Sequence, residues 1–344
     1  MRALTLVEHG GIDRLRLQEM PTPAVEQPDQ VRIQVRSAAL NRLDLFVLGG
    51  LPGITLPFPH VVGTDAAGVV DQVGAGVTGV APGDRVVVNP GISCGTCPMC
   101  TGGQDPLCRT FGVLGEHRAG TVAEYLVVPA RNVVKVGTHL SWAEAAALPL
   151  ATLTAWRMLV TRAQLKAGET ALIWGVGGGV SLAALQIAKY LGARVVATSS
   201  SEEKLAAARA LGADVTLNHA TQDVAREVRG LTKIGADVVV DSVGEKTWDK
   251  SLRALRPGGR LVTCGATTGP MVQIDIRKLF WFQWSILGST MGTVDEFAAM
   301  MAVANNGKLT PRVDLVVPLE QGVDAYRRLE SGGQLGKVVI EVSR

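Results

Sequence analysis

Thr170-Ala-Leu-Ile-Trp174 runs directly into Gly175-Val-Gly177-Gly178-Gly179-Val180-Ser181. The first segment is an apolar run of strand length, and the apolar residues between 180 and 191 recur at helical spacing. A glycine-rich turn between a strand and a helix lets the backbone approach a pyrophosphate, which then lies against the positive end of the helix dipole. The stretch therefore predicts a dinucleotide-binding unit, with Gly175, Gly178, Gly179 and Val180 as candidate contacts. The alternative is a tight turn in an α/β domain that holds no ligand.

Strand-like and Ala/Leu-rich segments alternate on the C-terminal side of this turn. Strands are expected at 193–197, 236–241 and 259–263, and a further helix at 201–211. Alternation of this kind predicts βαβ units, in which a parallel sheet is covered by helices on both faces.

The second strand of the unit indicates which nicotinamide cofactor is bound. NAD enzymes usually place an acidic residue at its end to hold the ribose 2′-hydroxyl, whereas a 2′-phosphate needs room and positive charge. The strand here ends in Thr198-Ser199-Ser200-Ser201, and no carboxylate precedes Glu202. The hydroxyls of Ser199 and Ser200, together with Lys204, favour NADP(H). NAD remains the alternative, because Glu202 lies within reach of a ribose.

The first 130 or so residues have a different pattern, with short β-rich segments separated by Gly and Pro. Strands are expected at 30–36, 67–73, 84–88 and 123–128, which predicts an antiparallel β-barrel-like domain. Segments 312–317 and 337–342 return to strand character and are expected to rejoin that domain. We therefore predict two domains, one formed by residues 1–132 with 308–344 and a nucleotide-binding domain at 133–307.

Four cysteines, Cys94, Cys97, Cys100 and Cys108, lie in one Gly/Pro-rich lobe at about residues 90–110. Four thiolates at this spacing can close a tetrahedral shell around Zn²⁺ and leave no open coordination position, which predicts one structural zinc per chain. The alternatives are disulfides or reduced thiols. Because the N-terminal residues contain no apolar core of signal-peptide length, we expect a cytoplasmic chain, in which disulfides are disfavoured.

Composition excludes several classes of function. The 344 residues are 47% apolar, and the net charge is +3. Residues of both charge signs are interspersed, so the sequence does not indicate a basic surface that would bind nucleic acid. The longest apolar stretch, at 171–188, is interrupted by glycines, a serine and a glutamine, and predicts a strand, a turn and a helix rather than a membrane span. We therefore expect neither a nucleic-acid nor a membrane partner.

The whole chain resembles the medium-chain dehydrogenase/reductase superfamily, which includes zinc alcohol dehydrogenases and quinone oxidoreductases. The segments that carry this resemblance are Ala39-Leu-Asn41-Arg-Leu-Asp44, Val62-Gly63-Thr64-Asp65-Ala-Ala-Gly68, Gly83-Asp84-Arg85-Val86, Asp241-Ser242-Val-Gly244 and Gly336-Lys337. The resemblance implies an α/β protein with a GroES-like β-barrel catalytic domain and a Rossmann domain that is a doubly wound parallel sheet. It also implies an NAD(P)H-dependent oxidoreductase.

One departure from the family pattern concerns the catalytic metal. Members with a catalytic zinc hold it with a cysteine, a histidine and a second cysteine, and the corresponding positions here are Asn41, Thr64 and Leu150. Leucine has no ligand atom, and an amide or hydroxyl is a poor Zn²⁺ ligand beside thiolate and imidazole. The site therefore resembles the quinone oxidoreductase branch, whereas the cysteine lobe resembles the alcohol dehydrogenase branch.

Hydride transfer from NADPH to a quinone, enone or related apolar carbonyl compound is the chemistry we expect without a catalytic zinc. The resemblance implies that Asn41 lies beside the nicotinamide and offers an amide N–H, with Thr64 as a second polar group. The other residues that it implies for the cofactor are Thr154 at the nicotinamide ribose, Gly265 and Ala266 under the nicotinamide, Ser289 and Thr290 closing that side, and His219 near the adenosine phosphate. Alternatively, Asn41 caps a turn and Thr64 is a satisfied buried hydroxyl. We identify no clear general acid: water is the expected proton source, His60 is the nearest alternative, and Asp44 is expected to order its neighbours.

Two other functions fit the same pattern: a zinc-containing NAD(P)-dependent alcohol dehydrogenase with a rearranged metal site, and an NADPH-binding structural or sensing protein without turnover. The segment Phe280-Trp281-Phe282-Gln283-Trp284 concentrates aromatic residues, which predicts either a subunit interface or a buried core strand. The family resemblance implies a homodimer or homotetramer.

Overall fold

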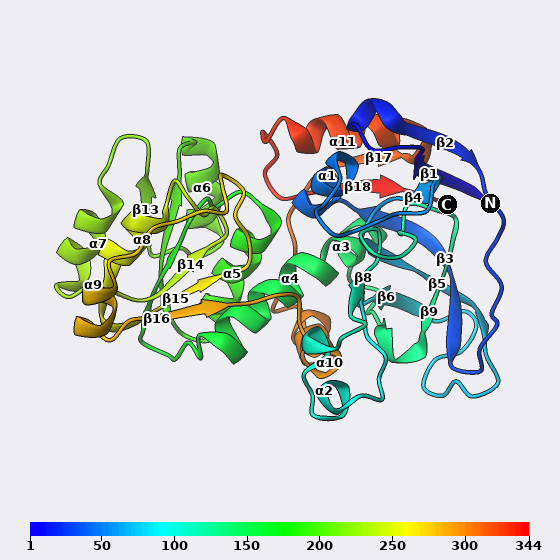
Figure 1. Cartoon of the computed structure of the whole chain (residues 1–344), viewed down its shortest axis with the longest axis horizontal. Coiled ribbons are helices and arrows are strands. Elements are labelled where there is room, and N and C mark those ends of the chain that lie inside the picture. Colours follow the sequence, from blue (N-terminus) through cyan, green and yellow to red (C-terminus); the bar gives the residue numbers. More distant parts are fainter. Residues whose placement is uncertain (344) are drawn as a thin grey trace. The chain divides into compact units, whose positions relative to one another are not determined.

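Strand β11 (Thr170–Ile173) lies inside a six-stranded parallel sheet in the computed structural model, which describes residues 1–343 (Figure 1). The strand order is β13-β12-β11-β14-β15-β16, and every pair in it is parallel. The other strands are β12 (Arg194–Ser199), β13 (Val215–Asn218), β14 (Ala236–Asp241), β15 (Leu255–Thr263) and β16 (Ser285–Gly288). This is the order of the doubly wound dinucleotide-binding fold, whose direction reverses between β11 and β14.

The central strands of this sheet are apolar throughout, because helices cover both faces. Ala171, Leu172 and Ile173 of β11 and Val238 and Val239 of β14 are fully buried, the pattern of parallel strands that face no water. The helices of this part are α5 (Gly179–Tyr190), α6 (Glu202–Ala210), α7 (Val224–Thr232), α8 (Trp248–Ala254) and α9 (Ile276–Trp281), preceded by a π-helical segment at Arg157–Arg162. The predicted Rossmann architecture is confirmed.

The β-rich part contains a seven-stranded sheet, in which β10-β6-β5-β3-β18-β17 follow one another and β9 also pairs with β3. These strands are β3 (Gln30–Ala39), β5 (Asp65–Val73), β6 (Arg85–Val88), β9 (Tyr125–Pro129), β10 (Val133–Lys135), β17 (Val313–Pro318) and β18 (Lys337–Glu341). Val31, Ile33 and Val35 of β3 are buried, while the residues between them are partly exposed. This alternation places one face of the strand on the core. As the sequence predicts, the two last strands return to the first sheet.

Smaller elements complete the β-rich part. They are strands β1 (Arg2–Leu6), β2 (Leu15–Glu19), β4 (His60–Val61), β7 (Gly91–Ile92) and β8 (Gly112–Val113), helices α1 (Arg42–Gly49), α2 (Pro98–Thr101), α3 (Trp142–Ala147), α4 (Pro149–Trp156), α10 (Val294–Asn305) and α11 (Gly322–Glu330), and 3-10 turns at Ile12–Arg14, Asp105–Leu107, Ala130–Asn132 and Leu319–Gln321. Helix α1 begins at Asn41 with a capping box completed by Asp44, and α10 begins at Thr293 with one completed by Glu296. Such boxes satisfy backbone N–H groups of the first turn.

The described chain divides into two packed units, one formed by residues 1–153 with 292–343 and the other by residues 154–291. The first unit thus includes α3, which packs against β3 and β5, and α10. The units thus divide at other positions than 132/133 and 307/308, the domain boundaries that we predicted, because α3 follows strand-poor sequence yet packs against β3 and β5. Helix α10 joins the first unit through hydrogen bonds of Val294 to Asp105 and of Asn305 to Gly137 and Lys135. Among residues 1–343, no helix combines the length and apolar character needed to cross a bilayer.

Candidate cofactor, substrate and metal sites

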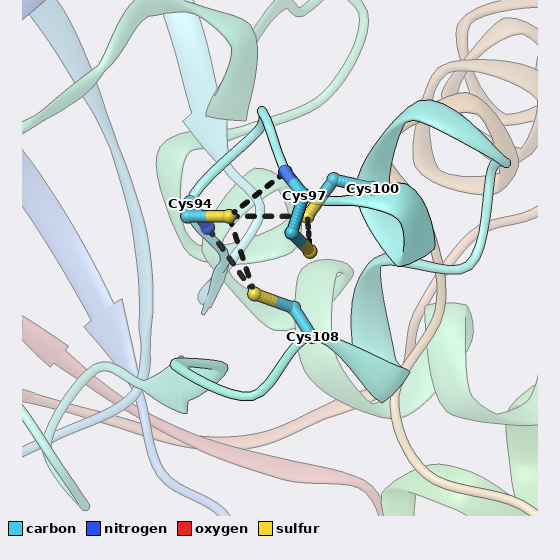
Figure 2. Close-up of side chains that lie close together, drawn as sticks. All are labelled: Cys94, Cys97, Cys100 and Cys108. Carbon is cyan, nitrogen blue, oxygen red and sulfur yellow. Dashed lines mark hydrogen bonds between the residues drawn. The ribbon is translucent and has the colours of Figure 1, made fainter.

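The four cysteines of the lobe converge on one point (Figure 2). The Sγ–Sγ distances are 3.6 Å for Cys97–Cys100, 3.6 Å for Cys94–Cys108 and 3.8 Å for Cys94–Cys100. A tetrahedron with Zn–S bonds of about 2.3 Å has edges of about 3.8 Å. These three distances match the edges of a closed ZnS₄ shell, and all four sulfur atoms lie within 4.8 Å of one another, so this lobe fits a structural zinc ion.

The backbone of the lobe favours thiolates at Cys94 and Cys108, whose pKa values are lowered. The backbone N–H of Cys100 also lowers the pKa of Cys97, but burial and the neighbouring thiols raise it to about 11. The N–H of Cys97 donates to Cys94 Sγ at 3.3 Å, and the N–H of Cys94 donates to Cys108 Sγ at 3.5 Å. Hydrogen bonds from the backbone of Thr96 and of Cys97 lower the pKa of Cys94 to about 5, which favours the form that binds a metal. All five cysteines of the chain are free thiols, so the disulfide alternative is not adopted.

The glycine turn has the shape that a bound pyrophosphate requires. Gly175 and Gly177 have φ angles of 63° and 144°, and Gly178 precedes the first residue of the twelve-residue helix α5. A Cβ on Gly177 would lie 2.6 Å from Cδ of Lys204, so the lysine stem crosses directly over this glycine. A Cβ on Gly178 would meet only Ser181 Oγ, at 3.8 Å. The turn thus leaves its backbone open at the helix N-terminus, where a phosphate is favoured.

The end of β12 carries hydroxyls rather than a carboxylate. Ser199 Oγ accepts from the N–H of Ser201, and Ser200 is exposed beside it. The carboxylate of Glu202 accepts a hydrogen bond from Asn218 Nδ2 at 2.8 Å, which directs it toward β13. Lys204 lies in the first turn of α6, and its backbone N–H donates to the hydroxyl of the N-cap residue Ser201. This set fits a 2′-phosphate better than a free ribose hydroxyl, because the one carboxylate of the set is already bonded.

The predicted cofactor residues further along the chain lie at the carboxyl ends of parallel strands. Gly265 and Ala266 follow β15, Ser289 and Thr290 follow β16, and His219 follows β13. Ligands of doubly wound sheets bind at this edge. The backbone N–H of Ser289 donates to the Thr263 carbonyl at 2.9 Å, while its hydroxyl is buried without a hydrogen-bond partner. Burial lowers the pKa of His219, which favours the neutral ring. Its Nδ1 lies 3.3 Å from Thr198 Oγ1. Thr154, in α4, is buried with its hydroxyl 4.0 Å from Met291 Sδ.

Asn41 and Thr64 belong to a buried polar network in the β-rich unit. Lys337 Nζ donates to Asn41 Oδ1 at 2.5 Å and to Asp65 Oδ2 at 2.9 Å. Asn41 Nδ2 donates to the same Asp65 oxygen at 2.9 Å, and the backbone N–H of Leu150 donates to Asp65 Oδ1 at 2.7 Å. These contacts fix the amide of Asn41, because its oxygen must face the ammonium and its nitrogen the carboxylate. One N–H of the amide is left for a further acceptor.

Strand register brings this network together. Ala39 of β3 pairs with Asp65 of β5 on one side and with Val339 of β18 on the other. Extending the antiparallel register of β18 by two residues places Lys337 opposite Asn41. A buried lysine is costly unless it is paired, and here the pairing is with Asp65.

Asp44 forms the second part of the network. Its Oδ2 accepts the backbone N–H of Asn41 at 2.6 Å, and its Oδ1 accepts the hydroxyl of Thr64 at 2.9 Å. Burial raises the pKa of this carboxyl to about 7, although both hydrogen bonds and the charge of Lys337 oppose the shift. The phenol of Tyr326 is fully buried beside it, and burial raises the pKa of that phenol too.

A catalytic zinc does not fit here. The three positions that correspond to its ligands do converge, since Asn41, Thr64 and Leu150 all lie within one hydrogen bond of Asp44 or Asp65. Their side chains offer an amide oxygen already bonded to an ammonium, a hydroxyl and no ligand atom at all. Among residues 1–343, the lobe cysteines form the only group of three or more Cys, His, Asp or Glu side chains arranged for a metal.

The expectation that His60 is the nearest general acid gains no support from its contacts. Its ring is buried, and Nε2 lies 3.0 Å from the carbonyl oxygen of Gly115. Burial lowers its pKa, which favours the neutral ring.

Two groups of residues with clear structural roles were missed from the sequence. Lys337 and Asp65 were matched to the family pattern but given no role, and the signal was a lysine in an apolar segment, Lys337-Val-Val-Ile. Ser181 and Thr198 hold the cofactor turn. The hydroxyl of Ser181 donates to the carbonyls of Gly175 and Gly178, and Thr198 Oγ1 accepts the N–H of Gly175. Hydrogen bonds from side chains to the backbone of a turn leave no periodic pattern in the sequence, so sequence analysis does not reveal them.

Comparison with known proteins matches both units. The family described as alcohol dehydrogenase GroES-like domain matches residues 27–138, and the family described as zinc-binding dehydrogenase matches residues 179–306. A zinc-type alcohol dehydrogenase-like protein of Schizosaccharomyces pombe is 34% identical over 99% of both chains. An acryloyl-coenzyme A reductase of Metallosphaera sedula is 33% identical, again over 99% of both chains. A solved structure of an NAD-dependent alcohol dehydrogenase superposes over 100% of both chains, with a TM-score of 0.96 and 45% identity.

Proposed function

Because this chain belongs to the medium-chain dehydrogenase/reductase superfamily of zinc-type alcohol dehydrogenase-like proteins, we propose that it transfers hydride without a catalytic zinc. The chain is an NAD(P)-dependent oxidoreductase of that type. The proposed reaction transfers hydride between NADP(H) and an enone, quinone or related carbonyl compound. The observation that carries this proposal is the Lys337-centred network at the positions of the family's catalytic-zinc ligands.

The chemistry of the network favours a carbonyl substrate. With no Lewis acid to lower a hydroxyl pKa, deprotonating a simple alcohol at neutral pH is unassisted. A conjugated carbonyl spreads the negative charge that develops when hydride arrives, and hydrogen-bond donors can stabilise its oxygen. The amide of Asn41 retains an N–H donor, while its oxygen is bonded to Lys337. The site thus has a donor to offer to a carbonyl oxygen.

The relatives support both this function and a second candidate. The Metallosphaera relative is an acryloyl-coenzyme A reductase, and an acryloyl group is a conjugated carbonyl. The structural relative at 45% identity is an NAD-dependent alcohol dehydrogenase, which favours alcohol oxidation as the second candidate. The two candidates differ in metal content and in cofactor.

The cofactor we propose is NADP(H), which supplies the hydride when bound. Gly175, Gly178, Gly179 and Val180 would hold its pyrophosphate through the open turn at the start of α5. Ser199, Ser200 and Lys204 would hold the 2′-phosphate. Thr154, His219, Gly265, Ala266, Ser289 and Thr290 are proposed to complete the cofactor site.

The deciding experiment is zinc analysis of the purified protein together with two assays. We expect one zinc per chain, NADPH oxidation with an enone or a quinone, and no NAD⁺ reduction with simple alcohols. Two zinc ions per chain with alcohol-dependent NAD⁺ reduction would establish the second candidate instead. Tight NADPH binding with no turnover of any enone, quinone or alcohol would contradict both.

We also propose a homodimer, or a tetramer built from such dimers, that assembles through the nucleotide-binding unit. β16 is an edge strand of its sheet, and Phe280 and Trp281 on α9 are 65% and 76% exposed. By contrast, Phe282 and Trp284 pack against the core of the unit. These exposures support a proposal in which the aromatic segment has both expected roles, with Phe282 and Trp284 in the core and Phe280 and Trp281 available to a partner.

A reduced cysteine lobe fits a cytoplasmic location, which we also propose. Cell fractionation with detection of the native chain tests this, and recovery from an oxidising compartment would contradict it.

A further inference from the structure

The hydride transfer proposed above needs a proton as well, and the network contains a pair of groups that can deliver one. Reducing an enone adds hydride to one carbon and leaves an enolate, which must be protonated. Asn41 can donate a hydrogen bond but, as an amide, cannot release a proton at neutral pH. The other polar group at a former ligand position is the hydroxyl of Thr64, and its partner is the carboxyl of Asp44 at 2.9 Å.

The two carboxyls of the network are not equivalent. Asp65 accepts from an ammonium, an amide and a backbone N–H, and it forms the ion pair with Lys337. Within residues 1–343, no cation lies within ion-pair distance of Asp44, and its hydrogen-bond partners are the N–H of Asn41 and the hydroxyl of Thr64. The charged and titratable groups that face Asp44 are Lys337 from β18, Asp65 from β5 and Tyr326 from α11. Among these, Lys337 and Asp65 neutralise each other, so an ionised Asp44 leaves the buried network with one uncompensated negative charge.

Hydrogen-bond directions decide where a proton on Asp44 would lie. Oδ2 accepts the N–H of Asn41 at 2.6 Å, so the proton belongs on Oδ1, which faces Thr64. The protonated carboxyl then donates to Thr64 Oγ, and the hydroxyl of Thr64 turns its own hydrogen toward another acceptor. With Asp44 ionised, Thr64 instead donates to the carboxylate, and both directions fit the O–O distance of 2.9 Å.

We propose that Thr64 is the catalytic proton donor of this enzyme and that Asp44 supplies the proton through it, a proposal that rests on the proposed function. The O–H bond of Thr64 breaks as a new O–H bond forms on the enolate oxygen, which gives an enol. The enol then tautomerises in water, losing its O–H proton and gaining one at the α carbon, to give the saturated carbonyl compound. The proton of Asp44 moves to Thr64 Oγ, and Asp44 is left as a carboxylate that accepts from Thr64. The hydride comes from NADPH, which becomes NADP⁺, and solvent reprotonates Asp44 before the next turnover.

The test is the pH dependence of kcat and of kcat/KM for NADPH-dependent enone reduction, in the full-length protein. For the natural chain we expect activity to fall above neutral pH, tenfold per pH unit, because Asp44 loses its proton. In Asp44→Asn the amide keeps both hydrogen bonds but delivers no proton, so kcat should fall by a factor of about 100 or more and lose this pH limb. Thr64→Val should show the same loss, and Thr64→Ser, which restores a hydroxyl, should recover most of kcat and the limb.

Thr121→Val is a matched control for Thr64→Val. Thr121 is equally buried, and its hydroxyl donates to the backbone carbonyl of Asp65 at the same distance of 2.9 Å. This variant removes a comparable hydrogen bond from the same unit and should keep the natural pH profile. Melting curves and NADPH binding establish that each variant is folded.

The outcomes separate the two proposals. An active enone reductase whose Thr64→Val variant keeps the natural kcat and pH profile would overturn the proton relay alone. A natural chain that reduces no enone or quinone would overturn the proposed function, and the relay with it.

Discussion

At the residue scale, Asp44 combines complete burial with two hydrogen bonds and no cation of its own. Its pKa rises from 3.8 to about 7 because burial penalises the carboxylate more than the hydrogen bonds favour it. Below about pH 4 the carboxyl of Asp44 is protonated in both the folded and the unfolded state, so its burial does not lower the free energy of unfolding. Between pH 4 and 7 the unfolded chain loses this proton while the folded chain keeps it, so stability falls as pH rises.

This linkage gives a prediction for Asp44→Asn. An asparagine carries no charge at any pH, so the free energy of unfolding of the natural chain should fall relative to the variant between pH 4 and 7. The slope should be about 1.4 kcal/mol per pH unit, and the difference should level off above pH 7. Urea unfolding of both chains at a series of pH values measures it. A difference that stays constant from pH 4 to 8 would show that the carboxyl is not penalised by burial.

Lys204 gives a second prediction at the residue scale. Its stem crosses Gly177, and it lies in the first turn of the helix that follows the hydroxyl-rich end of β12. A hydrogen bond between charged groups contributes about 1.5–3 kcal/mol, so Lys204→Ala should raise the Kd of NADPH by about 10- to 100-fold. The Kd of NADH should change less, since NADH has no 2′-phosphate.

Fluorescence titration of both cofactors measures this effect. Lys189→Ala is the matched control, because Lys189 lies at the other end of α5 and is paired with Asp214. Equal weakening of NADPH and NADH by Lys204→Ala would argue for a role of the lysine at the pyrophosphate rather than at the 2′-phosphate.

At the scale of elements, the cysteine lobe is tied to the start of α10. Asp105, between the third and fourth cysteines, accepts the backbone N–H of Val294 at 3.1 Å and the hydroxyl of Ser93 at 3.1 Å. A carboxylate at this place satisfies a first-turn N–H and interacts favourably with the helix dipole. The closed ZnS₄ shell would therefore stabilise a helix distant in sequence as well as its own loop.

We predict that removing zinc with a chelator will increase amide hydrogen exchange in the first turn of α10. Exchange in β11 and α5 should be unchanged, because those elements belong to the other packed unit. Mass spectrometry of the exchanged protein measures both. Asp105→Ala, which keeps all four cysteines, should loosen the same turn with one zinc still bound. Unchanged exchange at α10 in both cases would contradict the coupling.

At the scale of the whole molecule, the exposed aromatic side chains of α9 and the free edge of β16 favour assembly. An edge strand presents unpaired N–H and C=O groups, and a second copy can pair with them while covering the neighbouring apolar residues. Ile276, Phe280 and Trp281 lie on α9 with more than half of their surface exposed. A patch of this kind marks an interaction site more often than a solvent-facing surface.

Trp281→Glu should therefore dissociate the proposed dimer. The mass measured by light scattering is expected to fall to that of one chain, 36.1 kDa. Tyr190→Glu is the control, since Tyr190 is an exposed aromatic residue, 49% accessible, on α5 of the same unit. A natural chain that is already monomeric at micromolar concentration, or a Trp281→Glu protein of unchanged mass, would place the interface elsewhere.

The sequence by itself determined the parts of this protein that depend on neighbours along the chain. The turn at 175–179 and the cysteine lobe were predicted with their residues, because strand and helix periods and ligand spacings are local properties. The doubly wound sheet followed from the alternation of the same local signals. The sequence did not show which aromatic residues of segment 280–284 are exposed and which are buried. Phe280 and Phe282 are the same residue type two positions apart, at the end of a short helix, and only the structure shows that Phe280 is exposed and Phe282 packs against the core.

Only the tertiary structure decided how the buried network at the proposed substrate site is built. Asn41, Asp65 and Lys337 come from three strands or strand ends up to 296 residues apart, and pairing of β3 with β5 and β18 makes them neighbours. The family pattern indicated that a catalytic zinc is missing, but not that an ammonium takes part in the network at those positions. Hydrogen-bond partners and desolvation determine whether the buried Lys337 is tolerated and which of the two carboxyls, Asp44 or Asp65, pairs with it. They also determine which way the amide of Asn41 faces. These partners come together only once the sheet has formed.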